Sequence, residues 1–180
     1  NCPKRTCSSY KEIKNFLSNE SKLFLTVDGG VNLCLASNLI HYIDLFTYLT
    51  NETQIELNNN FLNKKMYNSK RKGFVELGGT VIVKNKKDDI MLVNCELESK
   101  RPVELELCNN NLRIKIFESM NKARVQSGKN GWEWENIKFL IENQSSLTNL
   151  VIDQIINTGS CDLPKIDESL RLHKSIIKSF

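Results

Sequence analysis

The sequence predicts an α+β fold in which helices cover one face of a largely antiparallel, open-faced sheet. Apolar residues recur at helical spacing near both ends of the chain, whereas residues 53–126 change to the period of two that is typical of strands. The chain has 180 residues, of which 40% are hydrophobic and 26% are charged, and this suits one domain that buries its own core. We therefore treat residues 1–180 as a single domain.

The order of helices and strands follows from where the apolar period changes. Helices are expected at 8–17, about 33–50, about 132–157 and 167–180. Strands are expected at 23–27, 53–58, 74–84, 89–98, 102–108, 112–118 and, as an edge, 121–126. The first strand ends at Asp28-Gly29-Gly30, which favours a turn, and Pro164 introduces the last helix.

The strands at 102–108 and 112–118 can be paired as a hairpin. If residues 109–110 form a two-residue turn, one face pairs Glu106 with Arg113 and Glu104 with Lys115. The other face then pairs Leu107 with Leu112, Leu105 with Ile114 and Val103 with Ile116. A slip of one residue breaks both sets, so this register is the one we predict.

The net charge of +4 comes from one segment, residues 61–90, which has eight basic and three acidic side chains. A nucleic-acid-binding protein usually has a broader basic face with aromatic partners, so this class is not favoured. The basic side chains are interpreted as a solvated loop, and the functional alternative is a clamp for a phosphorylated or nucleotide-linked sugar. They are Lys64, Lys65, Lys70, Arg71 and Lys72.

The composition also argues against several kinds of site. The six cysteines form no C-x-x-C pair and only two histidines are present, so no metal site is expected, and the thiols are expected to be reduced, in the cytoplasm. No apolar run approaches the roughly 20 residues of a membrane span. No G-x-G-x-x-G follows a strand, and the pairs Gly29-Gly30 and Gly78-Gly79 are interpreted as turn and bulge residues.

The helix at 33–50 carries the candidate chemistry. It is apolar on two sides and has one narrow polar row, formed by Ser37, His41, Asp44 and Tyr48. Buried polar groups need partners, so this row either lines a cleft or contacts solvent or a neighbouring loop. In the first case His41 exchanges a proton near neutral pH and Asp44, at i+3, orients its imidazole. In the second case His41 is structural.

Three segments of the chain resemble one protein family. The segment GGVNLCLASNLIHYIDLFTYL resembles the signature of the glucose–fructose oxidoreductase and inositol dehydrogenase family at the start of its carboxy-terminal domain. The opening NCPKRTCSSYKEIKNFL is similar to the segment that leaves the last strand of the dinucleotide-binding half, and CDLPKIDESLRLHKSIIKSF is similar to the terminal helix. The resemblance therefore covers essentially all of the chain.

This resemblance implies a two-domain oxidoreductase that acts on a sugar, a polyol or a sugar derivative. Its cofactor, NAD or NADP, and a catalytic lysine would belong to an amino-terminal Rossmann domain outside these 180 residues. This chain would then be the substrate and dimerisation domain and would have no dehydrogenase activity alone. The alternative is a non-catalytic sugar-binding or assembly module with the same fold.

The resemblance also assigns roles to single residues. His41 matches the family's catalytic histidine by position, and Asp44 matches the aspartate one turn later. Ser37 stands where the family often has an aspartate, and its hydroxyl cannot act as a carboxylate base. The residues expected to bind substrate are Asn32, Ser37, Asn38, Lys70 and Arg71, and those expected at a cofactor phosphate are Lys4 and Arg5, for which a surface role is the alternative.

A homodimer is expected through the face of the sheet that the helices leave open, because members of the family pair there. The strands also have more apolar residues than one layer of helices is expected to cover, and a two-fold dimer would bury the remainder. These residues are Leu77, Val81, Val83, Met91, Val93, Leu97, Val103, Leu105 and Ile114.

Overall fold

The structure is a computed structural model that describes residues 2–17 and 21–180. Its helices are the 3₁₀ turn η1 (Pro3–Thr6), α1 (Ser8–Phe16), α2 (Leu35–Thr50), η2 (Glu118–Met120), η3 (Gly128–Asn130), α3 (Gln144–Thr158) and α4 (Ile166–Ser179). Its strands are β1 (Phe24–Gly29), β2 (Ile55–Asn68), β3 (Val75–Asn85), β4 (Ile90–Cys95), β5 (Glu104–Cys108), β6 (Leu112–Phe117), β7 (Lys122–Ser127) and β8 (Glu135–Ile137).

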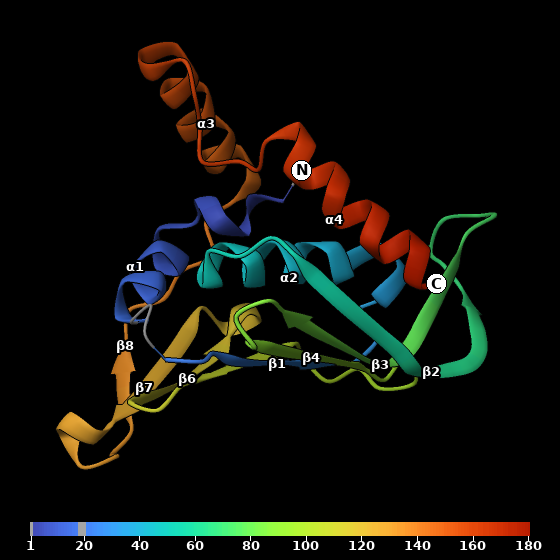
Figure 1. Cartoon of the computed structure of the whole chain (residues 1–180), viewed down its shortest axis with the longest axis horizontal. Helices are drawn as coiled ribbons and strands as arrows, with labels where there is room; N and C mark the ends of the chain where they lie inside the picture. Colours follow the sequence, from blue (N-terminus) through green and yellow to red (C-terminus); the bar gives the residue numbers. More distant parts are fainter. Residues whose placement is uncertain (1, 18–20) are drawn as a thin grey trace.

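The strands form one sheet in the order β2-β3-β4-β1-β5-β6-β7-β8. Among these strands only β1 and β4 pair in parallel, and every other neighbouring pair is antiparallel. Helices α1, α2 and α4 lie on one side of the sheet, and no described helix covers the other side (Figure 1). The predicted α+β architecture is confirmed.

Helix α2 lies against the middle of the sheet and supplies much of the core. The side chains of Leu35, Leu39, Ile43 and Phe46 are fully buried, as the apolar row predicted from the sequence requires. They belong to one cluster with the inward-facing residues of the strands, Leu25, Val27, Val81, Val83, Met91, Val93, Leu105, Leu107, Ile114 and Ile116. This burial sets the position of α2 relative to β1, β3 and β4.

The predicted register of the β5–β6 hairpin is wrong by two residues. Glu106 lies opposite Lys115, and Leu107 lies opposite Ile114, because the turn is centred on residues 110–111 and not on 109–110. The N–H of Asn109 donates to the carbonyl of Leu112 across this turn, at 3.0 Å. The Asn109 side chain accepts hydrogen bonds from the backbone N–H groups of residues 111 and 112, at 2.8 and 3.0 Å, and so stabilises the turn at this position. A shift of two keeps every side chain on its predicted face. Glu106 therefore still contacts both Arg113 and Lys115, at 3.0 and 3.1 Å.

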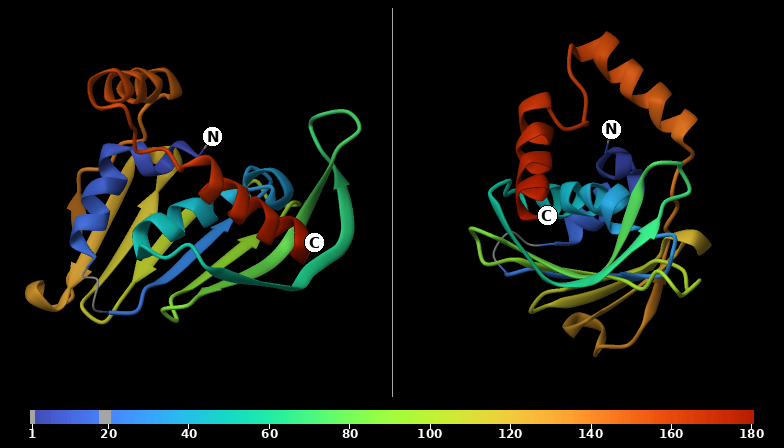
Figure 2. Two further views of the ribbon diagram at one scale, coloured as in Figure 1. Left: turned by 45° about the horizontal axis from the view of Figure 1, so that its top comes forward. Right: turned by 90° about the vertical axis from the view of Figure 1, so that its right-hand side faces the viewer.

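Strand β2 is longer than predicted. It runs to Asn68, so Lys64 and Lys65 belong to a strand and not to a loop. Two irregularities in its pairing with β3, at 58–61 and 62–66, interrupt the alternation of apolar residues that the sequence analysis relied on. Only the end of the basic segment, residues 69–74, forms the connection between β2 and β3, and this hairpin rises from the body of the fold (Figure 2).

The helix expected from residue 132 begins only at Gln144. The preceding residues include β8, which pairs with β7 so that Arg124 lies opposite Asn136. The guanidinium of Arg124 also lies 4.6 Å from the centre of the Trp134 ring. These contacts with a neighbouring strand favour extended backbone over the helix that the local sequence predicts.

The apolar strand residues that were expected to exceed what one layer of helices covers lie mostly in the core. Val81, Val83, Met91, Val93, Leu105 and Ile114 are fully buried on the side of the sheet that carries the helices. One layer of helices therefore covers more of these residues than was predicted. The open face instead presents the exposed side chains of Phe24 and Ile90, which lie opposite each other on β1 and β4.

None of the helices in the described part of the chain is both long and apolar enough to cross a membrane. All six cysteines are free thiols. Burial raises the pKa of Cys2 to about 11 and that of Cys7 to about 12, so neither thiol is a reactive nucleophile near neutral pH.

Candidate functional site

A cavity of about 610 Å³ lies between the start of α2 and the β2–β3 hairpin. Its lining includes six residues that the sequence analysis selected, namely Asn32, Ser37, Asn38, His41, Lys70 and Arg71. The first four come from the loop before α2 and from its first two turns, and the two cations come from the hairpin, about 30 residues further on. The structure therefore brings the expected substrate-binding residues into one place.

The loop that leads from β1 into α2 is held by backbone contacts with residues 99–101. The N–H of Val31 donates to the carbonyl of Ser99 at 2.7 Å, and the N–H of Gly30 donates to the carbonyl of Arg101 at 3.2 Å. A Cβ atom on Gly30 would lie only 2.2 Å from the Ser99 oxygen. Glycine is therefore required at position 30 for close packing, which fixes the start of α2 at the edge of the cavity.

The glycines of this chain do not fit a dinucleotide phosphate. Gly29 and Gly30 are both buried by the segment 99–103, and Gly79 is needed where the backbone of β2 passes within 2.6 Å of an added Cβ. No described glycine pair stands free at the start of a helix with its N–H groups directed outward, as a phosphate-binding turn requires. The interpretation of both pairs as turn and bulge residues agrees with these contacts.

His41 is half-buried in the cavity wall. Its Nδ1 has no hydrogen-bond partner among the described residues. Burial, followed by the positive charge of Lys4, lowers the pKa of the imidazole below its ordinary value of 6.5. The lowered pKa favours the neutral imidazole at pH 7.

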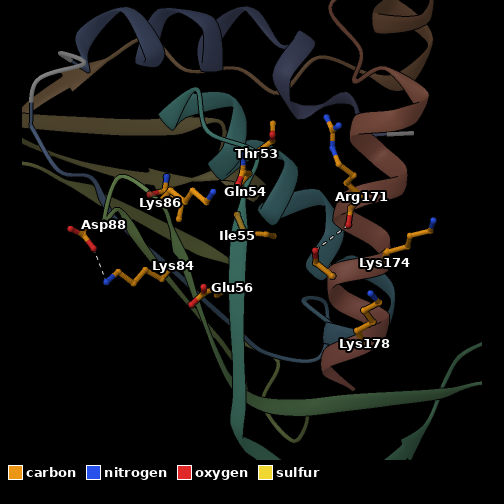
Figure 3. A pocket seen from close by; sticks show the side chains of 12 residues that line it. Thr53, Gln54, Ile55, Glu56, Lys84, Lys86, Asp88, Arg171, Lys174 and Lys178 are labelled. Carbon is orange, nitrogen blue, oxygen red and sulfur yellow. Dashed lines mark hydrogen bonds and ion pairs between the residues drawn. The ribbon is translucent and has the colours of Figure 1, made fainter.

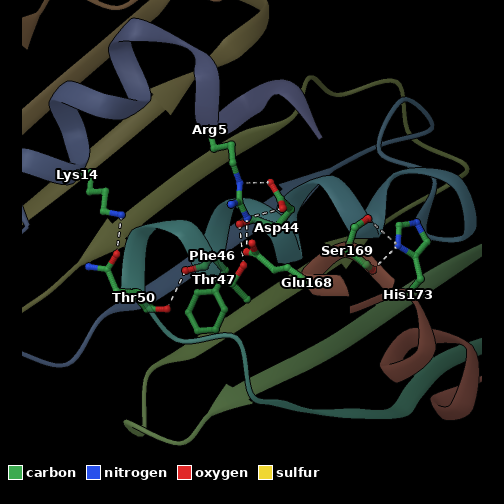
Figure 4. A network of polar contacts seen from close by, with 10 residues as sticks. Arg5, Lys14, Asp44, Phe46, Thr47, Thr50, Glu168, Ser169 and His173 are labelled. Atoms are coloured by element: carbon green, nitrogen blue, oxygen red, sulfur yellow. Dashed lines mark hydrogen bonds and ion pairs between the residues drawn. The ribbon is translucent and has the colours of Figure 1, made fainter. Parts of the chain in front are cut away.

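Asp44 does not orient His41 as expected. Its carboxylate is fully buried and accepts two hydrogen bonds from the Arg5 guanidinium, at 2.6 and 3.0 Å (Figure 4). No hydrogen bond joins it to His41 in the described structure. Arg5 also donates to Glu168 of α4 at 2.8 Å, and these carboxylates raise the pKa of Arg5 although burial opposes them. Asp44 therefore holds η1 and α4 against α2.

Lys4 and Arg5 are both engaged within the chain and are not available as expected to a cofactor phosphate. The Lys4 ammonium pairs with Glu118 and lies 4.6 Å from the centre of the Tyr42 ring. The Arg5 side chain is buried by its two carboxylate partners. Both cations stabilise the packing of the amino-terminal segment on α2.

Glu76 is a residue of the cavity that the sequence analysis missed. It lies on β3, is only 7% exposed, and accepts a hydrogen bond from the Ser37 hydroxyl at 2.7 Å. Its other oxygen, Oε2, has no partner among the described residues. In the sequence it is one polar residue in an alternating strand, and only the contact with α2 distinguishes it from the others.

A second cavity, of about 630 Å³, lies between β2, the β3–β4 turn and α4. It is lined by several cations, but their side chains do not converge on a common point (Figure 3). Lys84 turns toward Asp88, with which it forms an ion pair of 2.6 Å, whereas Lys174 points away on the opposite side. In residues 2–17 and 21–180, no group of three or more His, Cys, Asp or Glu side chains is arranged to hold a metal ion.

Replacing Asp44 by Asn should lower the free energy of unfolding by about 3 kcal/mol, because it leaves the buried Arg5 with Glu168 as its only anionic partner. Urea unfolding followed by circular dichroism measures this difference. The matched control is Lys11→Gln, which removes an ion pair with Asp162 that is exposed on both sides and should cost less than about 1 kcal/mol. Equal losses in the two variants would contradict a structural role for Asp44.

The His41 imidazole should titrate below 6.5 in the folded chain and near 6.5 in urea. Because the folded state disfavours the charged form, the contribution of His41 to stability is complete above 6.5 and declines as the pH falls through that value. Proton NMR of the ring resonances, assigned with His41→Gln, measures both values. A folded-state pKa above the denatured value would contradict the burial argument.

No family model and no curated protein matches this sequence. Solved structures match nearly the whole chain. A dehydrogenase from Clostridium difficile is 18% identical, with a TM-score of 0.66, and the match covers 100% of this chain and 61% of that one. A mutant 3-ketoreductase from Actinomadura kijaniata, in complex with TDP-benzene and NADP, is 12% identical, with a TM-score of 0.69 over 99% and 58%.

A third match is UDP-N-acetylglucosamine 3-dehydrogenase from Acidithiobacillus ferrooxidans, which is 9% identical, with a TM-score of 0.70 over 98% of this chain and 58% of that one. At these identities the likeness concerns the fold. The chain spans about three fifths of the length of each of these proteins. Nearly the whole chain therefore has the fold of the matched part of these dehydrogenases and reductases.

Proposed function

We propose that this chain is the substrate-binding domain of an NAD(P)-dependent oxidoreductase that acts on an alcohol group of a sugar, a polyol or a sugar derivative. The observation that carries the proposal is the cavity at the start of α2. It combines a neutral histidine, side chains that hydrogen-bond to hydroxyl groups, and two cations at its rim. Matched structures include a UDP-N-acetylglucosamine 3-dehydrogenase and a 3-ketoreductase, which supports a nucleotide-linked sugar as the substrate class.

In this proposal His41 accepts or donates the proton of the reacting hydroxyl. Its unpartnered Nδ1 and lowered pKa suit the neutral, proton-accepting form at pH 7. Asn32, Ser37 and Asn38 bind neighbouring hydroxyls of the sugar. Asp44 is a positioning residue. It forms no hydrogen bond with His41 in the described structure, but its bonds to Arg5 hold α2, the helix that carries His41, in place.

The cations at the rim recognise the charged end of the substrate. Lys70 and Arg71 are exposed on the β2–β3 hairpin and form no ion pair with a described carboxylate. A diphosphate bound there would leave the attached sugar inside the cavity, near α2. This arrangement favours the functional interpretation of the basic segment over that of a purely solvated loop.

We assign NAD or NADP mainly to a separate amino-terminal Rossmann domain, together with the catalytic lysine. The paired glycines Gly29-Gly30 and Gly78-Gly79 approach protein backbone and leave no phosphate cradle, which supports placing the dinucleotide site on that other domain. The six free thiols are consistent with a place in the cytoplasm.

The second candidate function is a non-catalytic sugar-binding or assembly module. It is favoured by one observation, namely that no described carboxylate hydrogen-bonds to His41. Such a module would bind the same sugars in the same cavity without exchanging a proton. Turnover by the protein that joins this chain to a Rossmann domain distinguishes the two.

In that two-domain protein, His41→Gln should reduce kcat for the oxidation of UDP-N-acetylglucosamine about 100-fold or more, with KM nearly unchanged, because proton transfer is lost and binding is retained. NAD(P)H absorbance measures the rate. The control is His173→Gln on α4, since His173 is exposed and its Nδ1 contacts only groups of Ser169. Unchanged turnover in His41→Gln would favour the non-catalytic module.

We also propose that the chain forms a homodimer through the open face of the sheet. Leu92 lies in the middle of this face, between Thr26 and Ile82 on the flanking strands. Sedimentation equilibrium should give twice the chain mass of 20.7 kDa, and Leu92→Arg should give a monomer because it places a charge in the interface. The control Leu170→Arg, on the exposed side of α4, should remain dimeric. A monomeric unmodified chain would contradict the dimer.

A further inference from the structure

We propose that Glu76 is a sugar-binding residue of the cavity, whose Oε2 accepts a hydrogen bond from a hydroxyl or amide N–H of the substrate. This inference rests on the proposed function, because it takes the sugar end of a nucleotide-linked sugar as the ligand.

The burial of Glu76 is the first observation. At 7% exposure the side chain is removed from bulk water, yet only Oε1 has a partner, the Ser37 hydroxyl at 2.7 Å. Oε2 contacts no hydrogen-bond donor in the described part of the chain. A buried carboxylate with one unsatisfied oxygen is costly for a fold to maintain, and such groups are typical of sites that bind a ligand.

The backbone around Glu76 provides the second observation. Strand β3 pairs with β4 only from Gly79 onward, whereas Glu76 pairs with Tyr67 of β2 on the other side. This end of β3 therefore extends past β4 toward the cavity, and the strand fixes the direction of the side chain. A binding group mounted on a strand and held by Ser37 is oriented before a ligand arrives.

The distribution of charge within the cavity is the third observation. Glu76 is buried, whereas Lys70 and Arg71 are exposed at the rim, and no ion pair joins either cation to Glu76. A buried carboxylate repels phosphate and attracts hydroxyl or amide donors, while the rim cations do the opposite. The cavity therefore favours a ligand that enters with its sugar first and leaves its phosphates outside.

The competing interpretation is that Glu76 only ties β3 to the first turns of α2. That role needs one oxygen, and Oε1 fulfils it through Ser37. It gives no reason for a charged group at this position, because a glutamine would accept the same hydrogen bond. The charge and the second oxygen are what the binding role explains.

The test compares two probes, UDP-N-acetylglucosamine and UDP, in isothermal titrations with this chain. Unmodified chain should bind UDP-N-acetylglucosamine more tightly than UDP. Glu76→Gln should weaken the binding of UDP-N-acetylglucosamine about tenfold and leave that of UDP unchanged, because only the sugar reaches Oε2. Replacing Lys70 and Arg71 by Gln should weaken both probes equally. The matched control is Glu135→Gln, an exposed carboxylate on β8.

The melting temperature separates binding from structure. Glu76→Gln should melt no lower than the unmodified chain, because it removes a buried charge and keeps the acceptor for Ser37. A lower melting temperature together with an unchanged preference for the sugar-bearing probe would overturn the inference. If Glu76→Gln does not fold, Glu76→Asp replaces it in the test. Aspartate keeps the charge but is one methylene shorter, so its oxygens lie farther from the sugar, and the variant should likewise lose the preference for UDP-N-acetylglucosamine over UDP.

The outcomes also separate this inference from the proposed function. If the unmodified chain binds neither probe, a nucleotide-sugar substrate is contradicted, and the role of Glu76 with it. If the unmodified chain prefers UDP-N-acetylglucosamine and the folded Glu76 variant keeps that preference, only the role of Glu76 is contradicted.

Discussion

Helix α2 buries apolar side chains around most of its circumference, and this requirement determines the positions of the elements around it. The sheet covers one side through β1, β3 and β4, while η1 and α4 approach the other. The buried guanidinium of Arg5 joins these segments, since it binds Asp44 of α2 and Glu168 of α4. The apolar core and the ion pair both act on α2. Each of them therefore restricts how the helix is rotated about its own axis.

The candidate site depends on that rotation. With Asp44 turned toward Arg5, residue 41, one turn earlier, and residues 37 and 38, two turns earlier, line the cavity beside the β2–β3 hairpin. The hairpin contributes exposed cations, and β3 contributes a buried carboxylate that Ser37 holds. A site with separated regions of opposite charge thus forms where a buried helix begins and a strand extends beyond its neighbour.

The two acidic residues Asp44 and Glu76 show why the site was only partly predictable. Helical spacing placed Asp44 one turn from His41, which made it the natural partner of the imidazole. The guanidinium of Arg5, from a segment 39 residues away in the sequence, forms a stronger charge-assisted pair with it. Glu76 had no distinguishing spacing at all, because its partner Ser37 belongs to another element.

The sequence by itself determined the fold class, the faces of the strands and the polar row of α2, because these depend on the period of apolar residues along one element. It also identified six residues that line one cavity. Only the tertiary structure decided the register of the β5–β6 hairpin, the strand that replaces a helix before residue 144, and the partners of Arg5 and Asp44. Those features depend on turn hydrogen bonds and on contacts between distant segments, and a local pattern of residue types contains no information about either.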